Sequence, residues 1–439
     1  MNITVAGTGY VGLVTGISLA EIGHKVICYD VNEEIIITLK SGKSTVYEPG
    51  LDNMLIRNVE EKRLFFTCDP QKAYASPEII VIAVGTPEKE DGSADLAFIK
   101  QVTFDIAHYF QSEELIVLTK STVPVGTNRK VKKWIEEELL SPIKLEVISN
   151  PEFLREGSAL YDTFNGDRII IGSDNKETFA KIEELYSPFN VPILQTDIES
   201  AEMIKYASNA FLATKISFIN EIANICEKVG ANIDDVSTGV GLDKRIGSSF
   251  LKAGIGYGGS CFPKDTKALV QLAGNVNHRF ELLDSVIKVN NMQRIRLYKK
   301  AKEVLGNFYG KTVAVLGLTF KPNTDDTRES ASLIIINELL KDGAMVNAYD
   351  PVAYKKMKLY FNKGITFTNN IEHAIRGAEV CLIITEWNEI LNFPLIKYRE
   401  LMKEPVIFDG RNCYKLDDVR SSNIQYYSIG RSEVIPPLR

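Results

Sequence analysis

The stretch Gly7-Thr-Gly9-Tyr-Val-Gly12 decides the fold of this 439-residue chain. It matches the pattern G-x-G-x-x-G, follows a short apolar run at residues 3–6, and opens an apolar-periodic stretch at residues 11–22. A glycine motif that lies between a strand and a helix is typical of a dinucleotide-binding βαβ unit. The sequence therefore predicts such a unit at the N-terminus, the alternative being a glycine turn without a ligand.

Each glycine of the motif has an expected physical role. Gly7 permits the tight turn, Gly9 lets a pyrophosphate approach the backbone, and Gly12 allows the helix to pack closely on the strand. Asp30 follows Gly12 by 18 residues and would accept hydrogen bonds from the ribose hydroxyls. No arginine among residues 31–34 could pair a 2′-phosphate, so we expect NAD rather than NADP.

Short apolar runs alternate with helical stretches at both ends of the chain. Gly23-His-Lys-Val-Ile-Cys-Tyr-Asp30 aligns with Gly343-Ala-Met-Val-Asn-Ala-Tyr-Asp350, whereas residues 200–229 and 263–305 have a helical pattern. This alternation predicts an α/β protein in which two Rossmann-like doubly wound domains are joined by a helical central domain. The expected domains are residues 1–199, 200–305 and 306–439.

The second alternating series lacks the glycine fingerprint and has Gly317-Leu-Thr-Phe-Lys321 in its place. This half of the chain could bind a different nucleotide or serve the structure alone, and the pattern leaves both possibilities open.

The composition excludes several classes of protein. Lys plus Arg number 51 and Asp plus Glu 57, a net charge of −6, which argues against a nucleic-acid binder. No apolar run approaches the roughly 20 residues that span a bilayer, and the N-terminus has no signal-peptide pattern. The six cysteines and four histidines show no metal-ligand spacing. We therefore expect a cytoplasmic protein with no metal site, no membrane association and no nucleic-acid partner.

A glycine-rich loop at residues 254–259 precedes Cys261, the candidate nucleophile. Pro263 favours the first turn of a helix, and a thiol at a helix N-terminus beside Lys264 is expected to have a lowered pKa. Asp265 adds a carboxylate to the same turn. The alternative is that Cys261 is a small residue in a tight loop, but the flanking glycines, cation and carboxylate favour a catalytic role.

Lys205 and Asn209 are four residues apart on the predicted helix at residues 200–229, so they share one face. Ala201 lies on the same side and indicates that this face points inward. An inward lysine beside an amide suggests proton handling or stabilisation of an oxyanion. A surface lysine with a buried stem is an equally good interpretation of the pattern.

Several longer strings carry a resemblance over residues 1 to about 415. They occupy residues 5–13, 47–51, 84–87, 91–95, 120–126, 150–157, 250–265, 324–330 and 408–411. In these strings the chain resembles the UDP-glucose/GDP-mannose dehydrogenase family. The resemblance implies oxidation of UDP-glucose to UDP-glucuronate with two molecules of NAD, through a thiohemiacetal and a thioester on Cys261. GDP-mannose or another nucleotide sugar is the alternative substrate.

The resemblance also implies roles for individual residues. The implied catalytic residues are Cys261, Lys205, Asp265, Asn209, Thr122 and Glu152. The implied NAD-binding residues are Gly7, Gly9, Tyr10, Val11, Gly12, Asp30, Thr86, Thr122, Glu156, Lys264 and Arg328. The implied substrate-binding residues are Glu152, Phe153, Leu154, Arg155 and Glu156, expected as a strand, with Lys205, Asn209, Arg245, Phe250, Leu251, Lys252, Ala253, Gly254, Tyr257, Gly258 and Lys321.

Within this set, Arg245 would reach the substrate of a partner subunit. A homodimer would then be the smallest active unit, with the helical middle as its interface, and a higher homo-oligomer is the alternative. Two positions depart from the family pattern: Ile35 stands where a basic residue is common, and Gly166 precedes Asp167-Arg168 where proline is common. The rival functions are a non-catalytic NAD-binding regulator and a two-electron hydroxyacid dehydrogenase, neither of which needs Cys261.

Overall fold

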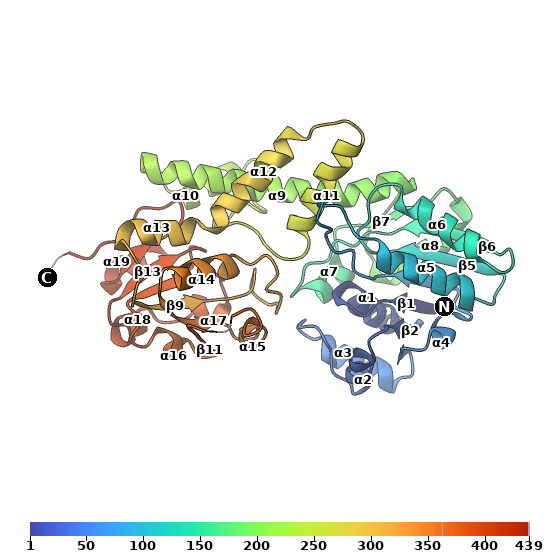
Figure 1. Cartoon of the computed structure of the whole chain (residues 1–439). Helices are drawn as coiled ribbons and strands as arrows, with labels where there is room; N and C mark the ends of the chain where they lie inside the picture. Colours follow the sequence, from blue (N-terminus) through green and yellow to red (C-terminus); the bar gives the residue numbers. More distant parts are fainter. Residues whose placement is uncertain (362, 438–439) are drawn as a thin grey trace. The chain divides into compact units, whose positions relative to one another are not determined.

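The computed structural model describes residues 1–361 and 363–437 and divides the chain into two compact units (Figure 1). The first unit comprises residues 1–208 and 271–278, and the second comprises residues 209–270 and 279–439. The protein is α/β, with two mainly parallel sheets and a helical central region, which confirms the predicted fold class. The predicted boundaries at residues 199/200 and 305/306 stay predictions.

The sheet of the first unit has eight strands in the order β3-β2-β1-β4-β5-β6-β7-β8. The first six follow the order 3-2-1-4-5-6 of dinucleotide-binding sheets and pair in parallel. β7 joins β6 antiparallel, through the pair Ser149 and Gly172. The strands are β1 (Asn2–Ala6), β2 (Lys25–Tyr29), β3 (Leu64–Thr67), β4 (Ile79–Ile82), β5 (Glu114–Thr119), β6 (Lys144–Ser149), β7 (Ile169–Gly172) and β8 (Ile193–Thr196).

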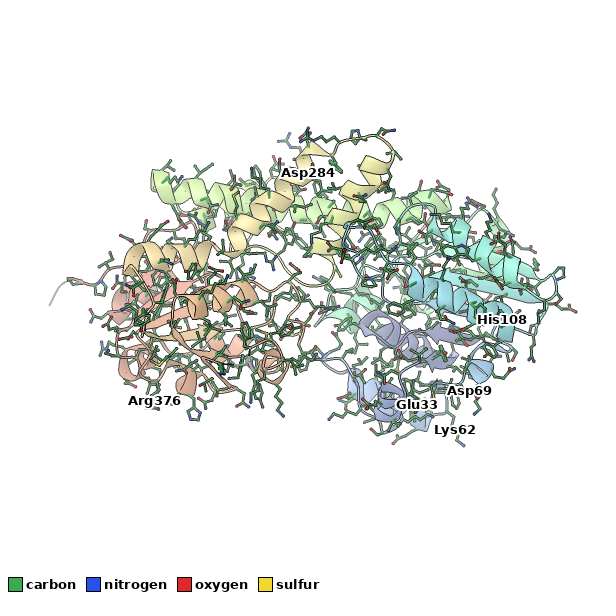
Figure 2. All side chains as sticks on the ribbon, in the orientation of Figure 1. Glu33, Lys62, Asp69, His108, Asp284 and Arg376 are labelled. Atoms are coloured by element: carbon green, nitrogen blue, oxygen red, sulfur yellow. The ribbon has the colours of Figure 1, made fainter. Side chains whose placement is uncertain are left out.

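Helix α1 packs on this sheet at very short range because two of its residues lack side chains. A Cβ at Gly12 would lie 2.0 Å from the carbonyl oxygen of Gly7, and one at Gly16 would lie 2.4 Å from the Cys28 sulfur. The helices of the first unit are α1 (Tyr10–Glu21), α2 (Glu33–Lys40), α3 (Leu51–Glu60), α4 (Pro70–Tyr74), α5 (Ala97–Tyr109), α6 (Thr127–Glu138), α7 (Ala159–Asn165) and α8 (Lys176–Tyr186). On the outside of α5, His108 is exposed and stacks on Phe104 with ring centroids 3.8 Å apart (Figure 2).

The sheet of the second unit repeats the same strand order with six parallel strands, β11-β10-β9-β12-β13-β14. The repeated Gly-to-Asp string predicted this, since its two copies lie on β2 and β10. The strands are β9 (Thr312–Leu316), β10 (Met345–Tyr349), β11 (Ile365–Thr368), β12 (Val380–Ile383), β13 (Val406–Asp409) and β14 (Gln425–Tyr427). The helices among them are α14 (Ala331–Lys341), α15 (Tyr354–Met357), α16 (Ile371–Ile375), α17 (Asn388–Leu391), α18 (Leu395–Leu401) and α19 (Leu416–Ser422).

The helical middle consists of α9 (Ile198–Val229), α10 (Ile233–Gly241), α11 (Phe262–Asn275), α12 (Glu281–Arg294) and α13 (Arg296–Leu305). The helical pattern at residues 263–305 is thus divided among three helices. After α11 the chain turns at Asn277, whose φ is +58°, a left-handed conformation that a continuing helix excludes.

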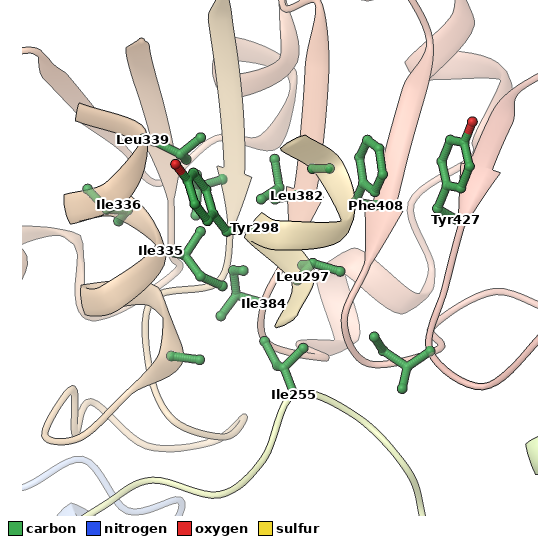
Figure 3. Packing of buried hydrophobic residues seen from close by; sticks show 14 of the residues in the cluster. Ile255, Leu297, Tyr298, Ile335, Ile336, Leu339, Leu382, Ile384, Phe408 and Tyr427 are labelled. Atoms are coloured by element: carbon green, nitrogen blue, oxygen red, sulfur yellow. The ribbon is translucent and has the colours of Figure 1, made fainter. Parts of the chain in front are cut away.

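Much of the middle shares a core with the second sheet. Leu297 and Tyr298 of α13 pack over Leu382 and Phe408 of the strands (Figure 3). Ile219 of α9 belongs to the same cluster. Among the described residues, no helix combines the length and apolarity needed to cross a bilayer.

Candidate active site

The glycine motif forms an open turn at the start of α1. Gly7 has φ +97°, and its N–H donates to the carbonyl oxygen of Tyr29 at 2.8 Å. The backbone N–H and the hydroxyl of Thr8 both donate to Asp30 Oδ2, at 2.9 and 2.7 Å. Gly9 precedes the first turn of α1, and a Cβ there would have no heavy atom within 4 Å. This combination of an open helix N-terminus and an adjacent aspartate fits the pyrophosphate and ribose of a dinucleotide.

Tyr10 joins this turn to the segment that follows β6. Its hydroxyl donates to the carboxylate of Glu48, which is 8% exposed. The backbone N–H of Gly157 donates to the Tyr10 hydroxyl oxygen and to Glu48 Oε2, each at 2.7 Å. The N–H of Leu160 donates to Glu48 Oε1 at 3.2 Å. Glu48 was not among the predicted site residues, although it lies in the string at residues 47–51 that carried the resemblance.

The segment from Glu152 to Glu156 is a loop, so the strand predicted there is wrong. β6 ends at Ser149, and Pro151 has no N–H with which to continue a ladder. The Leu154 N–H donates to Glu152 Oε2 at 2.5 Å, which turns the chain instead. Arg155 is directed to Asp162, which its guanidinium and backbone N–H both contact.

Lys205 of α9 and Glu152 form a buried ion pair in the first unit. Their Nζ–Oε1 distance is 3.1 Å, and their side chains are 5% and 6% exposed. The ring of Phe153 lies 5.2 Å from Lys205 Nζ, and the guanidinium carbon of Arg168 lies 3.9 Å from the same ring. Arg168 was not among the predicted site residues, but the structure places it one aromatic ring away from Lys205.

Of the remaining residues predicted in the first unit, Thr86 and Thr122 follow β4 and β5 within four residues. The Thr86 hydroxyl donates to the carbonyl oxygen of Thr122 at 2.9 Å, so these two are in contact. Val11 lies in the first turn of α1. Glu156 belongs to the loop that Glu48 anchors at Gly157. Their predicted roles in catalysis and in the binding of NAD and substrate stay predictions.

Asn209, Asp265 and Lys264 form a second cluster, within the second unit. Asn209 Nδ2 donates to Asp265 Oδ2 at 2.6 Å, and Lys264 Nζ donates to Oδ1 at 2.6 Å. The Asp265 side chain is 1% exposed, so its two oxygens are held by an amide and a cation away from water. The carboxylate is thereby fixed in position at the first turn of α11.

Cys261 stands immediately before α11 and is exposed. Its carbonyl oxygen accepts the N–H of Asp265 at 2.8 Å, which places Cys261 at the N-cap. A thiol in this position faces the positive end of the helix dipole. The predicted lowering of the Cys261 pKa stays a prediction.

Buried amide side chains hold the glycine-rich loop before Cys261. Asn220 Oδ1 accepts the N–H of Gly254 at 2.9 Å, and Gln293 Nε2 donates to the Gly254 carbonyl at 2.7 Å. Asn290 Oδ1 accepts the N–H of Tyr257 at 2.8 Å. Sequence reasoning missed these amides because they lie in ordinary helical patterns on α9 and α12.

The same loop packs on the second sheet. Ile255 is fully buried and inserts beside Leu297 and Ile384 (Figure 3). Arg411 Nη1 donates to the Gly256 carbonyl at 3.1 Å, and a Cβ at Gly258 would lie 2.3 Å from the carbonyl oxygen of Glu329. The loop is therefore a fixed platform and has no room for larger residues.

The other predicted substrate and cofactor residues of the second unit differ in exposure. Phe250 has φ +64°, a strained conformation for a residue with a side chain. Leu251 and Ala253 are buried, whereas Lys252 is exposed. The remaining cations are Lys321, 5.6 Å above the Phe320 ring, Arg328, paired with Asp326, and Arg245, paired with Asp243 and with a side chain that is 89% exposed.

Family comparisons account for nearly the whole chain. Residues 1–190 match the NAD binding domain of the UDP-glucose/GDP-mannose dehydrogenase family, residues 199–292 its central domain, and residues 314–416 its UDP binding domain. The chain belongs to this family. As a member of the UDP-glucose/GDP-mannose dehydrogenase family, it is an NAD-dependent oxidoreductase, which confirms the predicted cofactor and class of enzyme.

Named relatives in the family are similar over their full length. The UDP-glucose 6-dehydrogenases YwqF and TuaD of Bacillus subtilis (strain 168) are 56% and 48% identical, over 99% of this chain and 99% and 94% of their own. The structure of a UDP-glucose dehydrogenase from Pyrobaculum islandicum superimposes with a TM-score of 0.91 at 36% identity, covering 98% of each chain.

The family match also decides the question that the second alternating series left open, because residues 314–416 correspond to the UDP binding domain of the dehydrogenase family. Its Asp350, the counterpart of Asp30, is fully buried. The carboxylate accepts the N–H of Leu318 at 2.8 Å and the indole N–H of Trp387 at 3.1 Å. Asp350 is therefore enclosed by its own domain.

Proposed function

We propose that this enzyme oxidises UDP-glucose at C6 to UDP-glucuronate in two steps, through a covalent intermediate on Cys261. The observation that carries the proposal is an exposed thiol at the N-cap of α11, one turn from the fixed Asp265 carboxylate and its partner Asn209. A two-electron dehydrogenase or an NAD-binding regulator has no use for this arrangement. The names of the relatives support UDP-glucose as the substrate.

In the proposed chemistry, the C6 hydroxyl loses its proton and C6 loses a hydride, which converts the primary alcohol to an aldehyde. The Cys261 sulfur adds to the aldehyde carbon while the oxygen takes up a proton, which gives a thiohemiacetal. Loss of this hydroxyl proton and of a second hydride from C6 then gives a thioester. Water then hydrolyses the thioester and regenerates the thiol. Bound NAD supplies the hydride acceptor for both oxidations. The covalent bond retains the aldehyde between the two steps, so no reactive aldehyde is released.

Two fixed clusters would assist these steps. The Lys205 ammonium, held by Glu152 at 3.1 Å, would stabilise the developing negative charge on the C6 oxygen. Asn209 would donate to the same oxygen or orient Asp265, to which it is bound in the structure. Asp265 would orient the hydrolytic water. Because both clusters are buried, their electrostatic effects would be stronger than in water.

We also propose that the active enzyme is at least a homodimer. Phe211, Phe218 and Ile225 stand seven residues apart on α9 and are 66%, 55% and 53% exposed. Apolar side chains repeated at this interval form one stripe along a helix, as in helix–helix interfaces. A second copy of the chain would cover this stripe. The exposed Arg245 could then reach the substrate of the neighbouring subunit.

The deciding experiment measures NADH absorbance with excess NAD and limiting UDP-glucose, with GDP-mannose in parallel. Two NADH per UDP-glucose and no free aldehyde are expected. One NADH per sugar would refute the thioester step. A response to GDP-mannose alone would transfer the proposal to the alternative substrate, and no response to either sugar would favour another nucleotide sugar or the regulator.

A further inference from the structure

Lys120 is a charged residue that the proposed chemistry does not yet use. It follows β5 directly, and its ammonium end is directed inward. Its Nζ donates at 3.2 Å to the Oδ1 of Asn150, whose side chain is fully buried. The same Nζ lies 5.6 Å from the centroid of the Tyr186 ring. In the described part of the chain, no carboxylate lies within 4.0 Å of this nitrogen. The Lys120 charge is thus directed toward the domain interior without a paired anion.

Asn150 links Lys120 to the loop that carries Glu152. Its Oδ1 also accepts the hydroxyl of Tyr186 at 2.6 Å, and its Nδ2 donates to the Ile170 carbonyl at 2.8 Å. Asn150 thus ties together β5, β7 and α8 at the point where the chain leaves β6. The direction in which the chain enters the loop depends on these hydrogen bonds.

The Lys120 charge also acts on the Glu152–Lys205 pair. It attracts the Glu152 carboxylate and repels the Lys205 ammonium. Burial lowers the pKa of Lys120 from 10.5 to about 8, whereas burial raises the pKa of Tyr186, so that the phenol stays neutral. As the pH rises through about 8, Lys120 therefore loses its positive charge, and the cluster of Lys120, Glu152 and Lys205 then carries one positive charge fewer. A cluster with surplus positive charge favours a developing oxyanion.

We propose that Lys120 is a positioning residue for the Glu152–Lys205 pair: it holds the loop through Asn150 and supplies the second positive charge of the cluster. Lys120 keeps Glu152 from fully neutralising Lys205, so Lys205 retains its effect on the C6 oxygen. The inference rests on the proposed function, in which Lys205 faces that oxygen.

The test compares kcat and KM for UDP-glucose between pH 6.5 and 9.5. Lys120→Met is expected to lower kcat about tenfold or more. The wild-type kcat is expected to decline as the pH rises through about 8, because Lys120 loses its charge there. Lys120→Met should lack this decline, because the titrating charge is gone. Lys120→Arg keeps the charge but does not deprotonate in this range, so it should retain more activity and also lose the decline.

Two further variants separate the charge from the tether. Tyr186→Phe removes one hydrogen bond to Asn150 and keeps the charge, so KM should rise while the decline near pH 8 remains. Lys100→Met is the matched control, since Lys100 is an exposed lysine of the same unit whose Nζ lies 5.3 Å from the Trp134 ring centroid. Lys100→Met should change neither kcat nor KM.

A readout independent of activity separates this inference from the proposed function. The lowered pKa means that folded Lys120 binds fewer protons than the unfolded chain between about pH 8 and 10.5. The melting temperature of the wild-type chain should therefore rise with pH, relative to Lys120→Met, across this window. If the wild-type chain does not oxidise UDP-glucose, the proposed function fails while this titration still reports on Lys120.

Unchanged kcat in Lys120→Met would overturn the inference, and so would an unaltered decline near pH 8 in Lys120→Arg. If Lys120→Met does not fold, the arginine variant decides the matter, because it retains the charge and the tether. The inference would likewise fail if the melting temperature of the wild-type chain changed with pH in the same way as that of folded Lys120→Met.

Discussion

Alanine at Gly9 and at Gly12 should affect two different properties of the NAD-binding turn. A Cβ at Gly12 would lie 2.0 Å from the Gly7 carbonyl oxygen, at least 1.0 Å inside the 3.0 Å limit for such contacts. The turn and α1 must separate, at a cost of about 1–3 kcal/mol. For a domain of this size that corresponds to a fall in melting temperature of roughly 2–12 °C. NAD affinity should fall too, because the phosphate-binding N–H groups move.

Gly9→Ala should leave the fold intact and weaken NAD binding alone. No heavy atom lies within 4 Å of its Cβ position, and its φ of −65° is unstrained for alanine. The melting temperature should stay within about 2 °C of the wild-type value. Alanine lowers the conformational entropy of the unfolded chain, and this offsets its weaker N-cap. The Kd for NAD should rise about tenfold or more, a change of about 1.4 kcal/mol, because the new methyl group occupies the approach of the pyrophosphate.

The assays are thermal unfolding without ligand and calorimetric titration with NAD. Gly274→Ala is a suitable control, because this residue of α11 also has open space around its Cβ position and lies outside the predicted NAD site. Wild-type NAD affinity in Gly9→Ala would refute the placement of the pyrophosphate. An unchanged melting temperature in Gly12→Ala would refute the steric argument.

Three further predictions concern the chemistry, the cofactor and the assembly. Cys261→Ser should abolish net formation of UDP-glucuronate and leave the calorimetric affinity for NAD intact; normal product formation would exclude the covalent mechanism. Asp30→Asn should weaken NAD binding by about 1–2 kcal/mol, because hydrogen bonds to a charged acceptor are stronger than those to an amide; unchanged affinity would remove Asp30 from the site. If the proposed homodimer forms, Phe218→Glu should convert it to monomers in sedimentation analysis without lowering the monomer's secondary structure; persistence of the dimer would place its interface elsewhere.

The fold could be predicted wherever a local pattern carried the information. The continuous apolar run over β4 marks a strand buried on both faces, and the glycine motif fixes the junction of β1 and α1. β8, by contrast, has only partly exposed or exposed residues and no alternation to distinguish it from a loop. The antiparallel addition of β7 depends on long-range pairing that no local pattern reports.

The candidate site shows the same division. Cys261 and Asp265 belong to one string, so their proximity follows from a single helical turn. Glu48, Lys120 and Arg168 were missed because their partners are distant in sequence: Glu48 contacts Gly157, Lys120 contacts Asn150, and Arg168 contacts Phe153. A lysine that a strand end directs inward has the same sequence signature as one in solvent.

The enclosed Asp350 shows how a duplicated architecture can come to have two different uses. In the first sheet, Asp30 follows the second strand and lies beside an open glycine turn. In the second sheet, Asp350 has the same position but accepts hydrogen bonds from the loop after β9 and from the Trp387 indole. An acceptor whose hydrogen bonds are all satisfied within its own domain cannot also receive a ribose. In the second domain this aspartate therefore contributes to rigidity and not to a ligand contact, so the design of a dinucleotide site there would require removal of the Trp387 indole before the addition of a glycine.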